Sequence, residues 1–162
     1  MSATRRKRKP TSPPLSPEES LKKLHVPSGF RAELAASEPL VLDPVAFDWD
    51  ERGRLWVVEM ADYPLGMDGK SKPGGRVRVI EDTDGDGRYD KRTVFLDKLV
   101  LPRAISLVGD GLLVAEPPHL WFCRDTNGDG VCDEKTEVAR SEEHTSELQS
   151  HLNLVCRLLL EK

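Results

Sequence analysis

Long apolar runs, aromatic residues and cysteines are all scarce in this chain. No stretch is apolar and long enough to span a membrane, and no apolar segment follows the basic residues near the start, so neither a membrane span nor a signal peptide can be read. Aromatic residues make up 6% of the chain, and only three cysteines are present. The 162 residues, 38% hydrophobic and 32% charged, predict one ordinary globular domain, and the net charge of −4 says little about partners.

The first fourteen residues, Met1–Pro14, are basic and then rich in proline and serine, with almost no apolar side chain. Such a composition cannot bury enough apolar surface to order itself, so we expect a disordered basic leader. The run Arg5–Lys9 also fits a nuclear or nucleic-acid-binding tag. A flexible leader, or upstream sequence translated from a misplaced start, is the interpretation that we prefer, and we expect no nucleic-acid partner.

Two acidic, glycine-rich loops carry the clearest chemistry in the sequence. The first reads DTDGDGRYD and the second, 43 residues later, reads DTNGDGVCD. Calcium takes six to eight oxygen ligands, which a loop supplies from positions 1, 3 and 5, the carbonyl of 7, and 9, with glycine at the turn. The predicted ligands are Asp82, Asp84, Asp86, the Arg88 carbonyl and Asp90 in the first loop, and Asp125, Asn127, Asp129, the Val131 carbonyl and Asp133 in the second.

The two acidic loops can also be interpreted as solvated turns or as helical EF-hands. One such loop alone is as easily a solvated turn, but the recurrence of the ligand pattern favours calcium. A helical EF-hand ends in a bidentate glutamate at position 12, where this chain has Thr93 and Thr136. Because strand-like residues follow the first loop, we expect calcium loops set between β-strands.

The chain between the leader and the second loop is predicted to be a short helix followed by β-strands. Ser16, Pro17 and Glu19 form a capping-box start for a helix that ends near His25. The alternation over Phe30–Ala36 is typical of a half-buried strand. Strands are then predicted, in two groups of four, at 45–50, 54–60, 75–81 and 93–97, and at 104–108, 112–116, 119–124 and 136–139.

A four-stranded unit that recurs every 40–50 residues is typical of β-propeller blades. We therefore predict an all-β fold, an incomplete β-propeller of about two four-stranded antiparallel blades, with blade 1 at about 45–97 and blade 2 at about 104–139. An ordinary meander or sandwich with two similar hairpins is the alternative. Trp49, Trp56 and Trp121 are interpreted as aromatics that pack the blades.

The residues also resemble a known family. The phrases DPVAFDWD, GRLWVVEM and DTDGDGRYDK, within about Leu15–Ala139, are similar to the start of the exported proteins described as membrane-bound dehydrogenases of planctomycetes and verrucomicrobia. The resemblance implies a six-bladed propeller like the quinoprotein glucose/sorbosone dehydrogenases, often followed by a haem c domain with a CxxCH motif. This chain has no CxxCH, no readable signal peptide and fewer than two of about six blades, so the fold and the calcium loops are carried over and no catalytic residue is.

The function that the resemblance implies is that of a longer protein. This chain would be a truncated N-terminal piece, not active alone, of an exported, periplasmic or extracytoplasmic sugar or alcohol oxidoreductase. A quinone-type cofactor, haem c and a small carbohydrate or alcohol substrate would belong to the full-length protein. The partners of this piece would be the missing blades of the same propeller. The alternative is a non-catalytic, calcium-stabilised propeller that binds a glycan or a protein.

The last 23 residues do not match this blade pattern. Arg140–Ser150, RSEEHTSELQS, reads like the translation of a widely used short-read sequencing adapter, and His151–Lys162 like continued read-through. We therefore interpret 140–162 as an adapter-derived tail. Its leucines also form a helical stripe that fits a partner-binding amphipathic helix, an alternative that we consider weak.

Two cysteines bracket the second acidic loop, and the third, Cys156, belongs to the suspect tail. Cys123 and Cys132 form a C-x8-C pattern that permits a disulfide across the neck of the loop in an oxidising compartment. Two unpaired thiols are an equally good reading. Zinc is a weaker one, because His119 alone does not complete a tetrahedral site with them.

Overall fold

The computed structural model describes residues 15–61 and 73–141. The predictions for the basic leader, most of the loop after Met60 and nearly all of the tail therefore lie outside the described residues. The chain divides into two compact units at Ala35/Ala36, and each is described by itself. No helix among the described residues is long and apolar enough to cross a membrane.

The first unit contains one short helix, α1 (Pro17–Leu21). Its capping box is confirmed, since the Ser16 hydroxyl accepts from the Glu19 amide at 3.1 Å and the Glu19 carboxylate accepts from the Ser16 amide at 3.0 Å. The helix ends four residues before the predicted end at His25. Leu24 is 62% exposed, so it adds no packing energy that would extend so short a helix.

The predicted strand Phe30–Ala36 is wrong. The segment forms no ladder with any described residue, although Ala32 and Leu34 are half-buried between exposed neighbours. Alternation records which side chains avoid water, but a strand also needs a hydrogen-bonding partner, which a sequence pattern cannot supply.

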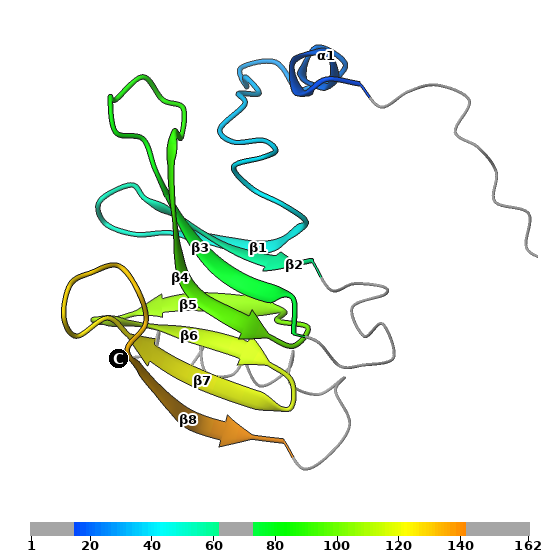
Figure 1. Ribbon diagram of the computed structural model, residues 1–162. Helices are drawn as coiled ribbons and strands as arrows, with labels where there is room; N and C mark the ends of the chain where they lie inside the picture. Colours follow the sequence, from blue (N-terminus) through cyan, green and yellow to red (C-terminus); the bar gives the residue numbers. More distant parts are fainter. Residues whose placement is uncertain (1–14, 62–72, 142–162) are drawn as a thin grey trace, which may run out of the picture. The chain divides into compact units, whose positions relative to one another are not determined.

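The second unit consists of two four-stranded antiparallel sheets, with the strands in sequence order. Figure 1 shows the two sheets stacked on one another. All eight predicted strands of these sheets are present, some with ends shifted by one or two residues. Sheet 1 contains β1 (Pro44–Trp49), β2 (Leu55–Met60), β3 (Gly75–Glu81) and β4 (Lys91–Leu99). Sheet 2 contains β5 (Ala104–Val108), β6 (Gly111–Glu116), β7 (His119–Arg124) and β8 (Glu134–Arg140).

The two sheets have the same arrangement of strands. Leu55 and Leu112 occupy the same place in the second strand of each sheet, opposite Trp49 and Leu107. The first strands of the two sheets, β1 and β5, are in contact. Two matching sheets side by side are the arrangement expected of neighbouring propeller blades, but the described residues do not form a closed propeller.

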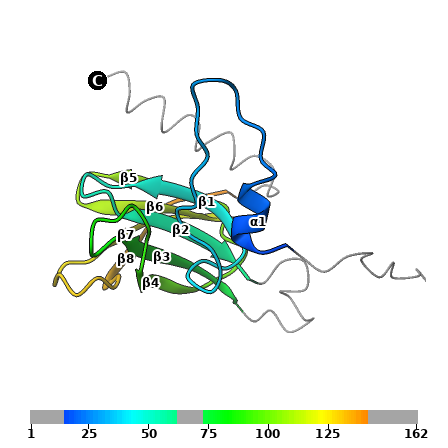
Figure 2. The same ribbon diagram turned by 90° about the horizontal axis from the view of Figure 1, so that it is seen from above.

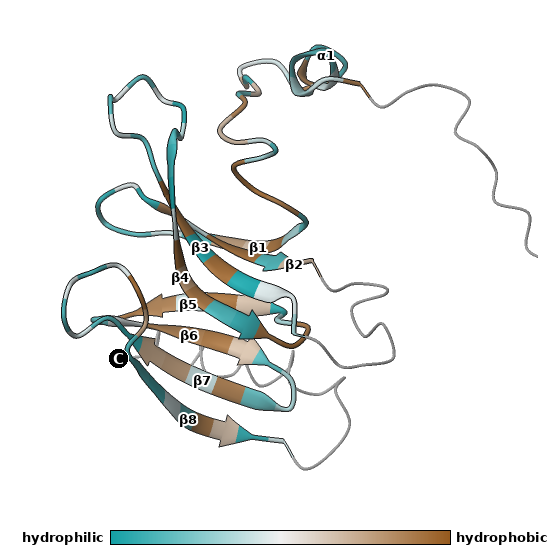
Figure 3. Cartoon of the chain, in the orientation of Figure 1, coloured by the Kyte–Doolittle hydropathy of each residue, from teal (hydrophilic) through white to brown (hydrophobic). Residues whose placement is uncertain are grey.

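The main hydrophobic core lies between the sheets. Trp56, Val77 and Phe95 of sheet 1 face Leu112 and Val114 of sheet 2, and brown apolar bands run along the strands in Figure 3. Burial of these side chains on facing sheets is the dominant favourable contribution to the fold. A smaller cluster on the other face of sheet 1 packs against Leu40 and Val41 of the connection that leads into β1.

The eighth strand extends to Arg140, one residue into the segment that we interpreted as an adapter-derived tail. The Ser141 amide also donates to the Pro118 carbonyl at 2.9 Å. Arg140 pairs with His119, so the ladder of sheet 2 includes the first residue of that segment. The boundary of the sheet therefore lies at 140 rather than 139.

Candidate metal sites

The first acidic loop joins β3 to β4 and is folded around Asp82. Its carboxylate accepts the Gly85 amide at 2.7 Å on Oδ1 and the Gly87 amide at 2.9 Å on Oδ2. Gly85 and Gly87 have φ of 78° and 87°, a conformation that favours glycine. The loop therefore wraps its backbone amides around one carboxylate, which fixes the position of that carboxylate.

The next two acids of this loop are held in the same way. Asp84 Oδ1 accepts the Asp86 amide at 3.2 Å, and Asp86 Oδ1 accepts the Arg88 amide at 2.8 Å. One carboxylate oxygen each of Asp82, Asp84 and Asp86 lies within 4.8 Å of the others. Three carboxylates gathered on one side of a turn form an oxygen-rich cluster that can bind a metal ion, and hard oxygen donors are the set that calcium prefers.

The second loop, between β7 and β8, repeats this hydrogen-bond frame. Asp125 accepts the Gly128 amide at 2.7 Å and the Gly130 amide at 2.8 Å. Asn127 Oδ1 accepts the Asp129 amide, and Asp129 Oδ1 accepts the Val131 amide, each at 2.8 Å. Asn127 supplies a neutral oxygen where the first loop has a carboxylate, so this loop offers the same geometry with one fewer negative charge. In Figures 1 and 2 both loops extend from the same end of the two sheets.

The ninth residue of each loop accepts hydrogen bonds from the second residue of the same loop. Asp90 lies outside the three-carboxylate cluster and accepts from Thr83, at 3.2 Å from the amide and 2.6 Å from the hydroxyl. Asp133 binds Thr126 in the same way, at 3.0 and 2.8 Å. Each of these aspartates therefore links the end of its loop to the beginning of the same loop. Their role as ligands, and that of the Arg88 and Val131 carbonyls, stays a prediction.

Hydrogen bonds to these exposed aspartates favour their charged forms. The Gly87 amide is the strongest influence that lowers the pKa of Asp82. The Thr126 amide, followed by its hydroxyl, lowers the pKa of Asp133. A carboxylate that several N–H groups hold in its charged form is ready to receive a cation without first losing a proton.

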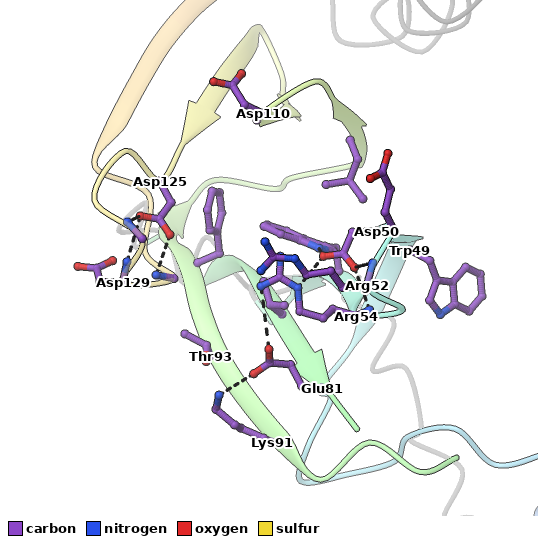
Figure 4. Close-up of a pocket in the computed structure, with 18 of the residues that line it drawn as sticks. Trp49, Asp50, Arg52, Arg54, Glu81, Lys91, Thr93, Asp110, Asp125 and Asp129 are labelled. Atoms are coloured by element: carbon purple, nitrogen blue, oxygen red, sulfur yellow. Dashed lines mark hydrogen bonds and ion pairs between the residues drawn. The ribbon is translucent and has the colours of Figure 1, made fainter. Parts of the chain in front are cut away.

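The second loop also touches sheet 1. The Cys132 amide donates to the Phe95 carbonyl of β4 at 2.8 Å, and an added Cβ at Gly130 would lie 3.5 Å from Thr93 Cγ2. Asp125 and Asp129 line one side of a cleft of about 770 Å³ between the sheets (Figure 4). The first loop contacts its own sheet through Tyr89, whose hydroxyl donates to the Gly53 carbonyl and accepts from the Trp49 indole.

Ion pairs line the cleft on the side of sheet 1. Arg54 Nε lies 2.6 Å from Asp50 Oδ2, and Lys91 Nζ lies 2.7 Å from Glu81 Oε2, as the dashed lines in Figure 4 mark. Burial raises the pKa of Asp50, but hydrogen bonds from the Trp56 indole and from Arg54 outweigh it and leave the pKa lowered. The charges on this wall are therefore largely matched within the protein.

The sequence analysis did not identify two buried glutamates that the structure shows. Glu59 lies one residue before the end of β2 and Glu116 ends β6, and each accepts an amide from the segment that leads into its sheet, Leu42 at 2.8 Å and Val100 at 2.6 Å. Arg78 Nε lies 3.1 Å from Glu59 Oε2, with an angle outside hydrogen-bond geometry, so the contact is an ion pair. The repeated phrases VVEM and VAEP, each placing a glutamate at or next to the end of an apolar strand, were the signal that could have shown them.

The three tryptophans do not share one role. Trp56 is buried against Phe95 with ring centroids 4.8 Å apart, which confirms its packing role. Trp121 is half-buried and donates to Glu116 at 2.7 Å. Trp49 is 54% exposed, so its interpretation as a packing aromatic is wrong for the described residues. Its ring forms an edge-on pair with Phe47, and its indole N–H donates to the Tyr89 hydroxyl.

Cys123 and Cys132, the predicted disulfide pair, are both free thiols in this structure. They are neighbours, since both pack in the same hydrophobic cluster and the Asp133 amide donates to the Arg124 carbonyl at 3.0 Å. The sequence interpretation of two cysteines at the neck of the loop is therefore right about their proximity, and the formation of the bond stays a prediction.

These features define a class of β protein, in which matched four-stranded sheets each carry an acidic loop between the third and fourth strands. The chain belongs to a family described as a domain of unknown function (DUF7133), whose model matches residues 16–156. The match covers both sheets and extends into the segment interpreted as adapter-derived. No curated protein and no solved structure matched the chain.

Proposed function

We propose that this chain is a calcium-stabilised pair of β-propeller blades, in which each acidic loop binds one Ca²⁺. The observation that carries the proposal is the repetition of the loop frame. Two loops of different sequence hold their first, third and fifth side chains with equivalent hydrogen bonds, at the same place in two matching sheets. A solvated turn needs no such agreement between two copies.

The donor set favours calcium over the other common cations. The positions that converge carry only carboxylate and amide oxygens, which suit calcium, whereas zinc prefers sulfur and nitrogen ligands. Magnesium demands near-ideal octahedral geometry and keeps several waters, so it is usually bound by one or two carboxylates and not by three. Because position 12 has threonine instead of a bidentate acid, we expect weak sites with a Kd of about 10⁻⁴–10⁻³ M, as in extracellular modules.

The wider assignment, to an exported dehydrogenase-like propeller, rests on the sequence resemblance alone. What supports it is the combination of phrases shared with that family, together with two sheets that fit neighbouring blades. On this proposal the present chain contributes scaffold, and the quinone-type cofactor, haem c, substrate and catalytic residues belong to other parts of the longer protein. A glycan- or protein-binding propeller remains the alternative.

Calorimetric titration of the full chain with Ca²⁺, after removal of metal with a chelator, tests the calcium proposal. We expect two weak sites in the parent protein, and one site in each of Asp84→Ala and Asn127→Ala, which alter different loops. Asp110→Ala is the matched control, because this exposed acid lies outside both loops, and it should keep both sites. Absence of any calcium heat at millimolar metal from the folded protein would overturn the proposal.

A further inference from the structure

The thiols of Cys123 and Cys132 occupy one place in the core between the sheets. Cys123 lies on β7, opposite Leu112 and Lys135, and is fully buried. Cys132 is half-buried, stands two residues before β8 and packs against the same hydrophobic cluster. The Asp133 amide donates to the Arg124 carbonyl at 3.0 Å, so the residues next to the two cysteines pair at the neck of the second loop.

The surroundings of the pair suit a disulfide better than a metal or a nucleophile. Among the described residues, the only group of three potential metal-binding acids, histidines or cysteines is the Asp82 cluster, so these cysteines have no further ligand gathered around them. Burial, with the second thiol next in effect, raises the pKa of Cys123 to about 12. A thiol with so high a pKa is too slow for a catalytic nucleophile at neutral pH but still undergoes slow thiol–disulfide exchange in alkaline solution, because the thiolate is the reactive form.

We propose that Cys123 and Cys132 form a redox modification site, at which a low-molecular-weight disulfide such as oxidised glutathione closes an intramolecular disulfide. The Cys132 thiolate attacks one sulfur of oxidised glutathione, which forms a mixed disulfide and releases one reduced glutathione. The Cys123 thiolate then attacks the Cys132 sulfur, the protein disulfide forms, and the second glutathione leaves as a thiol. Two protein thiols lose two protons and two electrons, and the glutathione disulfide gains them.

The position of Cys132 gives the bond a structural consequence. Its amide holds the Phe95 carbonyl of β4, so the residue that joins the disulfide is also the one that ties the second loop to sheet 1. A cross-link over the short segment 123–132 removes freedom from the unfolded chain, and we expect oxidation to raise the Tm by about 10 °C. The inference does not depend on metal binding by the loop.

The test uses the full chain with Cys156→Ser, so that the remaining thiol outside the described residues does not react. The protein is reduced, freed of metal with a chelator and incubated with oxidised glutathione at mildly alkaline pH. Trypsin cuts after Arg103, Arg124 and Lys135, so the bond would join the peptides 104–124 and 125–135. We expect this linked pair, a mass lower by two hydrogens, and the rise in Tm, all reversed by dithiothreitol.

Two single variants serve as controls. Cys132→Ser should neither form the linked pair nor gain stability from oxidant. Cys123→Ala should stop at a glutathione adduct on Cys132, as expected if the Cys132 thiolate attacks glutathione first. The proposal is overturned if the protein with both cysteines accumulates that adduct, or if both thiols stay reduced while the urea-unfolded chain oxidises readily. Metal-free conditions keep this result separate from the calcium titration.

Discussion

Replacement of Glu59 by glutamine is the most informative perturbation of the fold. The Glu59 side chain is fully buried, and its carboxylate neutralises Arg78, whose side chain is only 6% exposed. Arg76 Nε lies 3.4 Å away and is 28% exposed. Glutamine keeps an oxygen for the Leu42 amide, so the change removes the charge and little else.

The expected loss of stability comes from Arg78, which the substitution leaves without its ion-pair partner. Burial already lowers the pKa of Arg78, and Glu59 is the partner that most opposes this effect. Without that partner, the buried guanidinium loses its adjacent counter-charge, which typically costs about 3–5 kcal/mol. Glu81→Gln is the matched control, because Glu81 is 26% exposed and pairs with the exposed Lys91, and such a pair contributes at most about 1 kcal/mol.

Urea unfolding followed by circular dichroism measures both variants, with the m-value checked for two-state behaviour. Arg78→Met and the double variant Glu59→Gln/Arg78→Met complete a cycle, and we expect the double variant to be closer to the parent in stability than Glu59→Gln is. The reasoning is refuted if Glu59→Gln costs no more than Glu81→Gln, or if the cycle shows no coupling between the two positions.

The remaining predictions concern packing, pH and the tail. Gly111→Ala should destabilise the protein by about 1–3 kcal/mol in urea unfolding, because the new Cβ would lie 2.6 Å from the Phe122 ring; an unchanged midpoint would contradict this. The lowered pKa values of Asp82 and Asp133 contribute stability that is present above the ordinary aspartate pKa and is lost as the pH falls through the lowered values, so thermal melts should show a loss of Tm below about pH 4. Asp82→Asn should lessen that loss, and an unchanged acid profile would be evidence against it. Deletion of Glu142–Lys162 should leave the Tm within a few degrees of the parent if the tail is adapter-derived; a larger fall would show that the tail packs on the sheets, as the extent of the family match allows.

The sequence by itself determined the strands of the two sheets and the folding of the acidic loops. Alternation and β-branched residues are local signals, and so are the spacing of aspartates and the glycines that permit positive φ, so a reader of the sequence can find them. Gly87 and Gly130 follow the fifth residue of their loops in the sequence, and both have positive φ in the structure.

Tertiary structure decided which segments find partners and which groups meet across the chain. The alternation of apolar and polar side chains over Phe30–Ala36 predicted a strand, but no described segment pairs with it. Glu59 is a polar residue next to the end of its strand in the sequence, and only the approach of Arg78 and Leu42 makes it a buried charge with an ion-pair partner and a hydrogen bond. The contact between Cys132 and Phe95 depends on how one sheet packs on the other. Local sequence encodes backbone preference and burial, whereas partners distant in sequence are selected by the packing of the whole chain, which no single segment records.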